Sequence, residues 1–376
     1  PAHRLAQINM RVAVIGAGPA GATCAERLAR AGAHVTLLDE KLAWEKPCGG
    51  GITAKAWKRY PYLIENAQPK QSLQDVEMVS GGRSARFTLG DPLLIYSRLT
   101  LNALLIERAA SAGARVERDR VLETTRTAAG WRLRTRTAFL DADFCILANG
   151  ARNSFRALGA EFHPRDSMVA MGYRLPGESS AVYLEFFPQL SGYLWVFPRC
   201  GHLSIGICGK GMVSSEARRI LERWMDERGY RWREGEFYAH LIPALEPGSF
   251  AGLRLAGDRW LACGDAAGLV DPVTGEGIYY AIRSGDLACR ALVGKENYRT
   301  LLERDFLADL SIGARFAHRF YKGKVLGAPV TDRMVQLARR SRNIRAILRD
   351  LFAGEQGYQG LRARVMNVWR PILTQS

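Results

Sequence analysis

Residues 11–21 read RVAVIGAGPAG, and this stretch decides the fold. The run from Arg11 to Ile15 is short, apolar and β-branched, which predicts a buried strand. A helical pattern from Pro19 to Ala31 follows the glycines, and a second apolar run from His34 to Leu38 predicts the next strand. Strand, glycine turn, helix and strand in this order predict the start of a parallel, dinucleotide-binding sheet.

The glycine turn has the composition that a bound pyrophosphate requires. Glycine permits the tight turn and lets the backbone approach the phosphates, whose charge would lie at the positive end of the following helix. An acid at the end of the second strand, Asp39 or alternatively Glu40, would accept hydrogen bonds from a ribose. We expect the turn to contact the nucleotide through Gly16, Gly18, Pro19, Ala20 and Gly21. A glycine turn without a ligand is the alternative when this motif is taken alone.

Composition narrows the class of protein. The chain has 53 Lys and Arg against 37 Asp and Glu, a formal net charge of +16 that favours anionic partners. No nucleic-acid motif accompanies this charge, so a nucleic-acid partner is not expected. The seven cysteines form no CxxC pair and the six histidines show no ligand spacing, so neither a disulfide framework nor a metal site is expected.

The same sequence contains no pattern of a membrane span. No run of about twenty apolar residues is present, and the start lacks the order of a signal peptide. Any membrane contact, at the inner face, is therefore expected to be peripheral. The scattered cysteines favour a reducing, cytoplasmic setting. Met10 could be the natural start, in which case residues 1–9 are an extension.

A second glycine-rich segment lies far downstream. CGDAAG at residues 263–268 is followed by DPVTGEGI at residues 271–278. A Gly-Asp pair after a buried strand can place a carboxylate against the ribityl and phosphate region of FAD, and a turn at a helix start presents N–H groups that would stabilise an anionic reduced flavin. The expected contacts here are Gly264, Asp265, Gly275, Gly277 and Ile278. A plain loop and helix cap is the weaker alternative.

Together the two motifs resemble the FAD proteins of p-hydroxybenzoate hydroxylase fold, over about residues 11–292. Two further segments resemble the geranylgeranyl reductase family in particular: KPCGGG at residues 46–51 and GYLWVFP at residues 192–198. The resemblance implies a mixed α/β fold with an FAD-binding dinucleotide fold, an inserted antiparallel-sheet substrate domain and a helical C-terminal region. It also implies that Arg98 lies near the FAD phosphates and ribityl chain, with Gly49 and Gly50 close to the flavin ring.

The same resemblance extends to residues 148–156, which match the Asp-Gly motif of the wider group. Asn149 stands where that motif has Asp, and Asn153 where it often has Ser. A secondary nucleotide contact from this segment is therefore in doubt.

The order of strands and helices predicts that the chain leaves the cofactor domain twice and returns. A hairpin turning at Gly81-Gly82 is the first departure, and the aromatic-rich strands after residue 161 are the second. A hairpin around Ala128 to Gly130 and a strand from Phe144 to Ala148 are expected to close the first sheet. The expected parts are an FAD-binding domain at 10–75, 95–160 and 255–296, substrate-domain strands at 76–94 and 161–254, and a helical C-terminal region at 297–376.

Enzymes of the family that the chain resembles add hydrogen across carbon–carbon double bonds of a prenyl chain, with reduced FAD as hydride donor. We expect Cys48 to lie over the flavin and to deliver or orient a proton; a small packed residue is an equal alternative. Tyr193, Trp195 and Phe197 alternate along a strand and so share one face. That face is expected to line an apolar substrate tunnel, where the rings of Tyr193 and Trp195 would tolerate a developing cation. Ordinary aromatic packing is the alternative.

The electron donor and the lipid contact rest on less specific patterns. No second GxGxxG follows a later strand, so a transiently bound NAD(P)H or a reduced electron-carrier protein is expected as donor. Basic and apolar residues interleave near the C-terminus, which predicts a cationic amphipathic helix that could rest on anionic lipid headgroups; a solvated helix face is the alternative. The residues concerned are Arg339, Arg340, Arg342, Arg345 and Arg349, with Ile344, Ile347, Leu348 and Leu351.

Two other functions remain open at this point. A flavin monooxygenase or halogenase would share the architecture, although a halogenase usually has Trp-x-Trp-x-Ile-Pro where Tyr193 to Pro198 read YLWVFP. A non-catalytic flavin-binding protein is the other alternative. The sequence identifies neither the prenylated or lipid substrate nor the oligomeric state.

Overall fold

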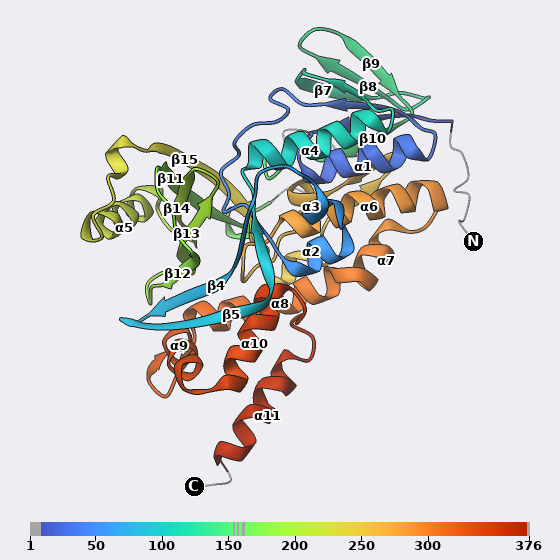
Figure 1. Ribbon diagram of the computed structural model, residues 1–376. Coiled ribbons are helices and arrows are strands. Elements are labelled where there is room, and N and C mark those ends of the chain that lie inside the picture. Colours follow the sequence, from blue (N-terminus) through green and yellow to red (C-terminus); the bar gives the residue numbers. More distant parts are fainter. Residues whose placement is uncertain (1–8, 153–154, 156–157, 160–161, 374–376) are drawn as a thin grey trace.

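The computed structural model describes residues 9–373, apart from 153–154, 156–157 and 160–161, with side chains to residue 367. It contains two large sheets, with a set of helices at the C-terminal end packed beneath the second one (Figure 1). The fold is the expected mixed α/β arrangement of a parallel dinucleotide-binding sheet, an antiparallel substrate sheet and C-terminal helices.

The first sheet is the predicted nucleotide-binding sheet. Its strands in spatial order are β16 (Ala256–Gly257), β17 (Trp260–Ala262), β10 (Phe144–Leu147), β1 (Arg11–Ile15), β2 (His34–Leu38) and β6 (Arg115–Glu117). The pairs on both sides of β1 are parallel, and their residues are almost all buried because helices cover the sheet. Helix α1 (Pro19–Arg30) packs against both α4 (Arg98–Ser111) and α6 (Ile278–Gly294).

One predicted part of this sheet is wrong. The hairpin around residues 128–130 forms, but β7 (Val121–Arg126) and β8 (Trp131–Thr135) join β9 (Phe139–Ala142) in a separate three-stranded sheet. In β8 the buried Trp131 and Leu133 alternate with exposed arginines, which pair with acids on the neighbouring strands. The apolar face of this small sheet, with Trp131 and Leu133, packs into the core of the first sheet, so β8 lies against that sheet and not within it.

The second sheet has eight strands, all antiparallel except one pair. In spatial order they are β15 (Glu236–Pro243), β11 (Ser167–Leu175), β14 (His202–Lys210), β13 (Gly192–Arg199), β12 (Ala181–Phe186), β4 (Gln71–Ser80), β5 (Arg83–Ile95) and β3 (Gly51–Ile52). The two departures of the chain meet where β4 and β12 pair in parallel, with Val76 opposite Val182. This sheet begins earlier in the chain than residue 76, because β3 and the first residues of β4 belong to it.

The two faces of the second sheet are covered differently. Helix α5 (Ser214–Glu227) packs Leu221 and Met225 on one face. On the other face lie the C-terminal helices (Figure 1). They are α8 (Ala308–Lys322), α9 (Val330–Arg340), α10 (Arg342–Ala353) and α11 (Leu361–Leu373), with a small hairpin of β18 (Lys324–Val325) and β19 (Ala328–Pro329) between α8 and α9. The short helix α7 (Tyr298–Leu302) packs instead against α6 in the first domain. Two short helices, α2 (Ala54–Arg59) and α3 (Tyr62–Glu65), lie between β3 and β4 in the chain.

The orientation of α10 corrects the predicted lipid contact. Ile344, Ile347 and Leu348 are buried and pack with the apolar residues of β4 and β5. The apolar stripe between the arginines is therefore part of the protein core. The predicted contact of this stripe with lipid is wrong. No helix among the described residues has the length and hydropathy that spanning a bilayer requires.

Candidate functional site

A mainly apolar cavity of about 1020 Å³ lies between the two sheets and the C-terminal helices. Of the residues predicted from sequence, it is lined by Gly18, Pro19, Ala20, Cys48, Gly49, Gly50, Arg98, Tyr193, Trp195, Phe197, Asp265, Gly275, Gly277 and Ile278. Five others do not line it: Gly16, Gly21, Asp39, Glu40 and Gly264. Ala148 and Gly150 also reach the cavity, whereas Asn153 lies outside the described residues. The structure thus brings the two glycine motifs and the aromatic strand to one place.

The three glycines of the first turn differ in what surrounds them. Gly16 has a φ of +104°, and a Cβ on Gly16 or on Gly21 would overlap backbone atoms. A Cβ on Gly18 would meet nothing within 4 Å. Gly18 is the N-cap residue of α1, which has no side-chain cap, and it faces the cavity. The positive end of α1 is therefore open to an anionic group from the cavity.

The structure separates the two acids considered for the ribose. The carboxylate of Asp39 accepts N–H groups from Ala17, at 2.9 Å, and from Lys41, at 2.8 Å. Asp39 therefore lies directly beside the glycine turn. The carboxylate of Glu40 points to the surface, where it pairs with Arg120 at 3.6 Å and Arg136 at 3.3 Å.

Arg98 provides an unpaired polar atom at the cavity wall. This side chain is only 4% exposed, donates to Asn102 at 3.2 Å and stabilises the Cys48 thiolate by a side-chain hydrogen bond. Its buried Nε has no partner among the described residues. A buried donor without a partner is costly, so this position suits a polar or anionic ligand group.

Asp265 is paired with a lysine that sequence reasoning did not single out. Lys46 Nζ lies 3.0 Å from the Asp265 carboxylate, and both line the cavity. Burial would raise the pKa of Asp265, but the Lys46 charge outweighs it and the pKa is lowered. Nearby His240 has its pKa lowered to about 4 by burial, so its ring is neutral. Lys46 lies inside the quoted KPCGGG segment, where only the small residues had been assigned.

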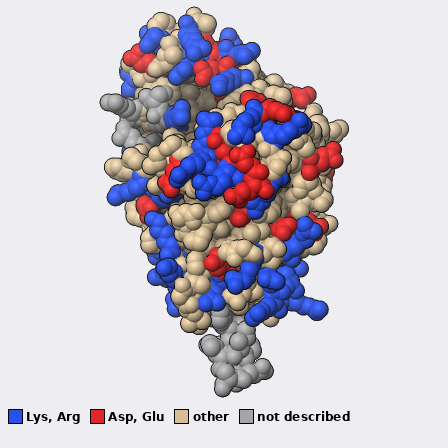
Figure 2. Space-filling view, turned by 90° about the vertical axis from the view of Figure 1, so that its left-hand side faces the viewer, with Lys and Arg blue, Asp and Glu red and all other residues tan. Residues whose placement is uncertain are grey.

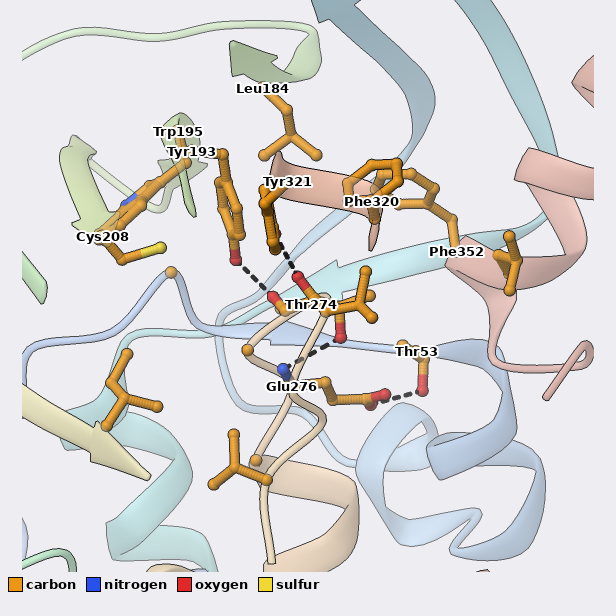
Figure 3. Close-up of a pocket in the computed structure, with 18 of the residues that line it drawn as sticks. Thr53, Leu184, Tyr193, Trp195, Cys208, Thr274, Glu276, Phe320, Tyr321 and Phe352 are labelled. Carbon is orange, nitrogen blue, oxygen red and sulfur yellow. Dashed lines mark hydrogen bonds between the residues drawn. The ribbon is translucent and has the colours of Figure 1, made fainter. Parts of the chain in front are cut away.

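Two tyrosines hold the loop of the second glycine motif from above (Figure 3). Tyr193 donates its hydroxyl to the carbonyl of Thr274. Tyr321, from α8, donates to the carbonyl of Val273 at 2.5 Å. Tyr193 thus has a structural role beside its place on the cavity wall. Nothing in the sequence spacing indicates Tyr321, because it belongs to no motif and follows Phe320 in a helical region.

The same loop contains two buried carboxyl groups. Burial raises the pKa of Asp271, and burial together with the charge of Asp271 raises the pKa of Glu276 to about 7. Thr53 donates its hydroxyl to Glu276 at 2.9 Å (Figure 3). Glu276 stands between the two assigned glycines of the motif and lines the cavity. It can therefore hold a proton at neutral pH beside the ligand space.

Cys48 lies at the cavity between two arginines and a backbone donor. The Gly50 N–H lies 3.3 Å from its sulfur. Burial would raise the pKa of the Cys48 thiol, but the charges of Arg98 and Arg199 together with that N–H lower it overall. Arg199 is itself buried, paired with Glu45 and bonded to the carbonyl of Cys48. The thiol is thus held in a fixed electropositive setting.

The aromatic strand β13 has the predicted two faces. Leu194 and Val196 pack toward α5, whereas Tyr193, Trp195 and Phe197 line the cavity. The rings of Tyr193 and Trp195 meet edge to face at 6.1 Å. Beyond them the cavity continues between the second sheet and the C-terminal helices, past Leu184, Phe320 and Phe352 (Figure 3). In the part of the chain that the structure describes, no group of acidic, His or Cys side chains could hold a metal ion.

Comparison with known proteins gives consistent matches. Residues 10–171 match the family model described as pyridine nucleotide-disulphide oxidoreductase. Digeranylgeranylglycerophospholipid reductase 2 of Methanothermobacter thermautotrophicus is 30% identical over 309 residues, 75% of this chain and 78% of the relative. The menaquinone reductase of Mycolicibacterium smegmatis is 29% identical over 81% of this chain and 83% of that protein.

A solved structure agrees over nearly the whole chain. The crystal structure of a geranylgeranyl bacteriochlorophyll reductase-like protein from Thermoplasma acidophilum superposes with a TM-score of 0.78, covering 96% of this chain and 99% of the other, at 20% identity. This likeness shows the fold. Sequence identity and fold lead to one conclusion: the chain belongs to the geranylgeranyl reductase family and is an FAD-dependent oxidoreductase of that type.

Proposed function

We propose that this protein reduces carbon–carbon double bonds of a prenyl chain. The observation that carries the proposal is the continuity of one cavity, which begins at the two glycine motifs and extends as an apolar space into the C-terminal helices. A cavity with polar groups at one end and apolar walls at the other fits a long hydrocarbon chain whose reacting bond lies at the polar end. The relatives' names, which include a glycerophospholipid reductase and a menaquinone reductase, support this class of substrate.

FAD fits the polar end of the cavity. Gly18 at the open start of α1 suits the pyrophosphate, Asp39 beside the turn suits the ribose, and Arg98 has a buried donor free for a polar group. The further contacts proposed are Pro19, Ala20, Gly49, Gly50, Asp265, Gly275, Gly277 and Ile278, with Gly16, Gly21 and Gly264 shaping the turns behind them. When bound and reduced, FAD supplies a hydride. A transient NAD(P)H or a reduced carrier protein is the proposed source of electrons.

The residues around the hydrocarbon have separate tasks in this proposal. An isolated alkene has no oxygen to accept charge, so reduction needs a proton at one carbon as well as a hydride at the other. Cys48, held by the Gly50 N–H and two arginines, is the proposed proton donor or positioner. Tyr193 and Trp195 line the space where positive charge develops, and with Phe197 they keep water away from it.

The experiment is anaerobic incubation of the dithionite-reduced protein with a panel of prenylated quinones, prenyl lipids and free prenyl diphosphates. Mass spectrometry of the recovered compounds should show gains of two hydrogens per bond reduced. A panel that returns unchanged while the protein is fully loaded with flavin rejects the proposal. Parallel incubation with oxygen and halide tests the alternative function, because a monooxygenase or halogenase adds one oxygen or one halogen atom instead.

A further inference from the structure

The exposed apolar side chains of this protein gather around one opening. Ten large apolar residues are exposed among those described, and half of them line the outer end of the cavity. These five are Ile312, Phe316, Val325, Leu326 and Met366, and we call them the apolar rim. Single exposed apolar residues are ordinary, but a cluster at one opening marks a contact surface.

The hairpin between α8 and α9 presents the most exposed member of the apolar rim. Leu326 is 85% exposed at the tip and has a φ of +50°, a conformation that is unfavourable for leucine. Arg333 donates to the carbonyl of Leu326 at 2.9 Å and to that of Val325 at 3.2 Å, so the hairpin is held in place from α9. An apolar side chain kept in a strained and solvated position suggests a partner that covers it.

Unpaired arginines surround the same opening. Arg315, Arg319, Arg340 and Arg362 are exposed and line the cavity, and no described carboxylate lies within ion-pair distance of any of them. The acidic residues between 312 and 366 have other partners: Asp332 accepts from Ser80, Asp350 pairs with Arg364, and Glu355 pairs with Lys58. Figure 2 shows Lys and Arg side chains on both flanks of the lower end of the molecule, with mostly uncharged surface between them.

We propose that the apolar rim and these four arginines form a docking surface for a membrane that carries anionic lipids. Leu326 and Val325 would enter the headgroup region, and the arginines would lie at the level of the lipid phosphates. The cavity would then open onto the bilayer, so a prenyl chain could pass from lipid to protein without crossing water. The positive charge around an apolar opening favours an anionic bilayer over a second copy of this chain, which would bring like charges together. The inference rests on the proposed function for the identity of the lipid cargo.

The test measures binding of the flavin-loaded protein to vesicles by flotation. Vesicles of phosphatidylcholine alone are compared with vesicles that contain about 30% phosphatidylglycerol, and binding is expected only to the anionic ones, weakened by high salt. Replacing both Arg315 and Arg319 by Gln should weaken partitioning on the order of thirty-fold, because each arginine near an anionic surface contributes about 1 kcal/mol. Leu326→Asn should weaken it about ten-fold.

Matched controls lie elsewhere on the surface. Arg219 and Arg223 of α5 are exposed, unpaired among the described residues and separated by the same four positions, so R219Q/R223Q controls for loss of charge. Phe139 of β9 is 69% exposed, so F139N controls for loss of an apolar side chain. Neither control should change vesicle binding, and thermal unfolding of all variants should match the unaltered protein.

Three results would overturn the docking surface. The first is equal binding to neutral and anionic vesicles. The second is full binding by R315Q/R319Q and by Leu326→Asn. The third is a stable dimer in solution that these same variants dissociate. The proposed function is tested separately, by reduction of a detergent-dispersed prenyl compound by the unaltered protein. A protein that binds anionic vesicles through the rim but reduces nothing keeps the docking surface and rejects only the function.

Discussion

The hydroxyl of Tyr358 donates to both carboxylate oxygens of Asp271, at 2.7 and 2.9 Å. Tyr358 lies between α10 and α11, whereas Asp271 begins the loop that leads to Gly275 and Gly277. Both side chains are buried. The C-terminal region therefore fixes the loop that is proposed to contact the flavin, although the two segments are far apart in the sequence.

Tyr358→Phe should loosen that loop without leaving a hole. A buried carboxylate loses a hydrogen bond, which costs about 1.5–3 kcal/mol in the free energy of unfolding. The dissociation constant of FAD should rise as well, because the proposed contacts at Gly275 and Gly277 follow on the same loop. Urea unfolding and flavin titration measure both effects. Tyr321→Phe removes a bond to a neutral carbonyl and should cost about 1 kcal/mol. Equal effects of the two variants would contradict the prediction.

Glu276 should make stability depend on pH. Its folded pKa of about 7 lies above its ordinary value of 4.5, so the folded state holds the proton more tightly. The stability that this group contributes is complete below about pH 4.5 and is lost as the pH rises through 7. In the unaltered, flavin-free protein this group should lower the free energy of unfolding by on the order of 3 kcal/mol between about pH 5 and pH 8. Glu276→Gln should remove that part of the pH dependence.

Urea unfolding at the two pH values measures this difference. Glu107→Gln, at an exposed position of α4, is the matched control and should follow the unaltered protein. Parallel pH dependence of Glu276→Gln and the unaltered protein would show that this carboxyl does not carry the effect.

Two glycine variants separate flavin contact from packing. Gly18→Ala places a methyl group where no protein atom lies within 4 Å, so the flavin-free protein should lose at most about 1 kcal/mol, the cost of a poorer N-cap. Its affinity for FAD should fall at least about ten-fold, because the methyl group occupies the place proposed for the pyrophosphate. Gly21→Ala should instead destabilise the fold itself, since its Cβ would overlap the carbonyl of Gly16. Unchanged flavin affinity in Gly18→Ala would remove the proposed phosphate contact.

Replacing Cys48 tests its chemical role. Cys48→Ser and Cys48→Ala should depress alkene reduction while flavin occupancy, measured by absorbance, stays intact. The lowered pKa also predicts that alkylation of the Cys48 peptide is half-maximal below pH 9 in the flavin-free protein. Full turnover in both variants would favour the alternative that Cys48 only fills space.

Narrowing the apolar part of the cavity should select substrates by length. Leu351 of α10 is half-buried at the cavity wall, so Leu351→Trp places a larger side chain in that space. The KM for a four-unit prenyl chain should rise more than the KM for a two-unit chain, because only the long chain reaches the C-terminal helices. Leu292→Trp, on α6 and outside the cavity, is the control. A uniform change in KM for both lengths would speak against the tunnel.

The sequence predicts the two sheets well because their local patterns are strong. The run from Arg11 to Leu38 combines a glycine turn with apolar strands on both sides, and every predicted element of it is confirmed. The aromatic alternation in β13 likewise predicts a shared face correctly. In both cases neighbouring residues carry the information, so no knowledge of distant contacts is needed.

What the sequence misses depends on contacts between distant segments. An amphipathic pattern in α10 shows which side is apolar, but it does not show whether protein or lipid covers that side. Tyr321 and Tyr358 belong to no sequence motif, and only the folded chain brings them to the loop at 271–274. The sequence shows that Glu276 belongs to the motif, but it does not show that the side chain is buried. The raised pKa of Glu276 results from that burial.

The pairing of strands across long stretches of chain affects how the protein must be made. One edge of β4 has no partner strand until β12 has been synthesised. One edge of β10 likewise has no partner until β17, which pairs Ala262 with Leu147, has left the ribosome. A growing chain therefore exposes unpaired edges and apolar faces through much of its synthesis, which invites aggregation. Production of this protein should accordingly depend on slow translation and on chaperones more than its ordinary composition suggests.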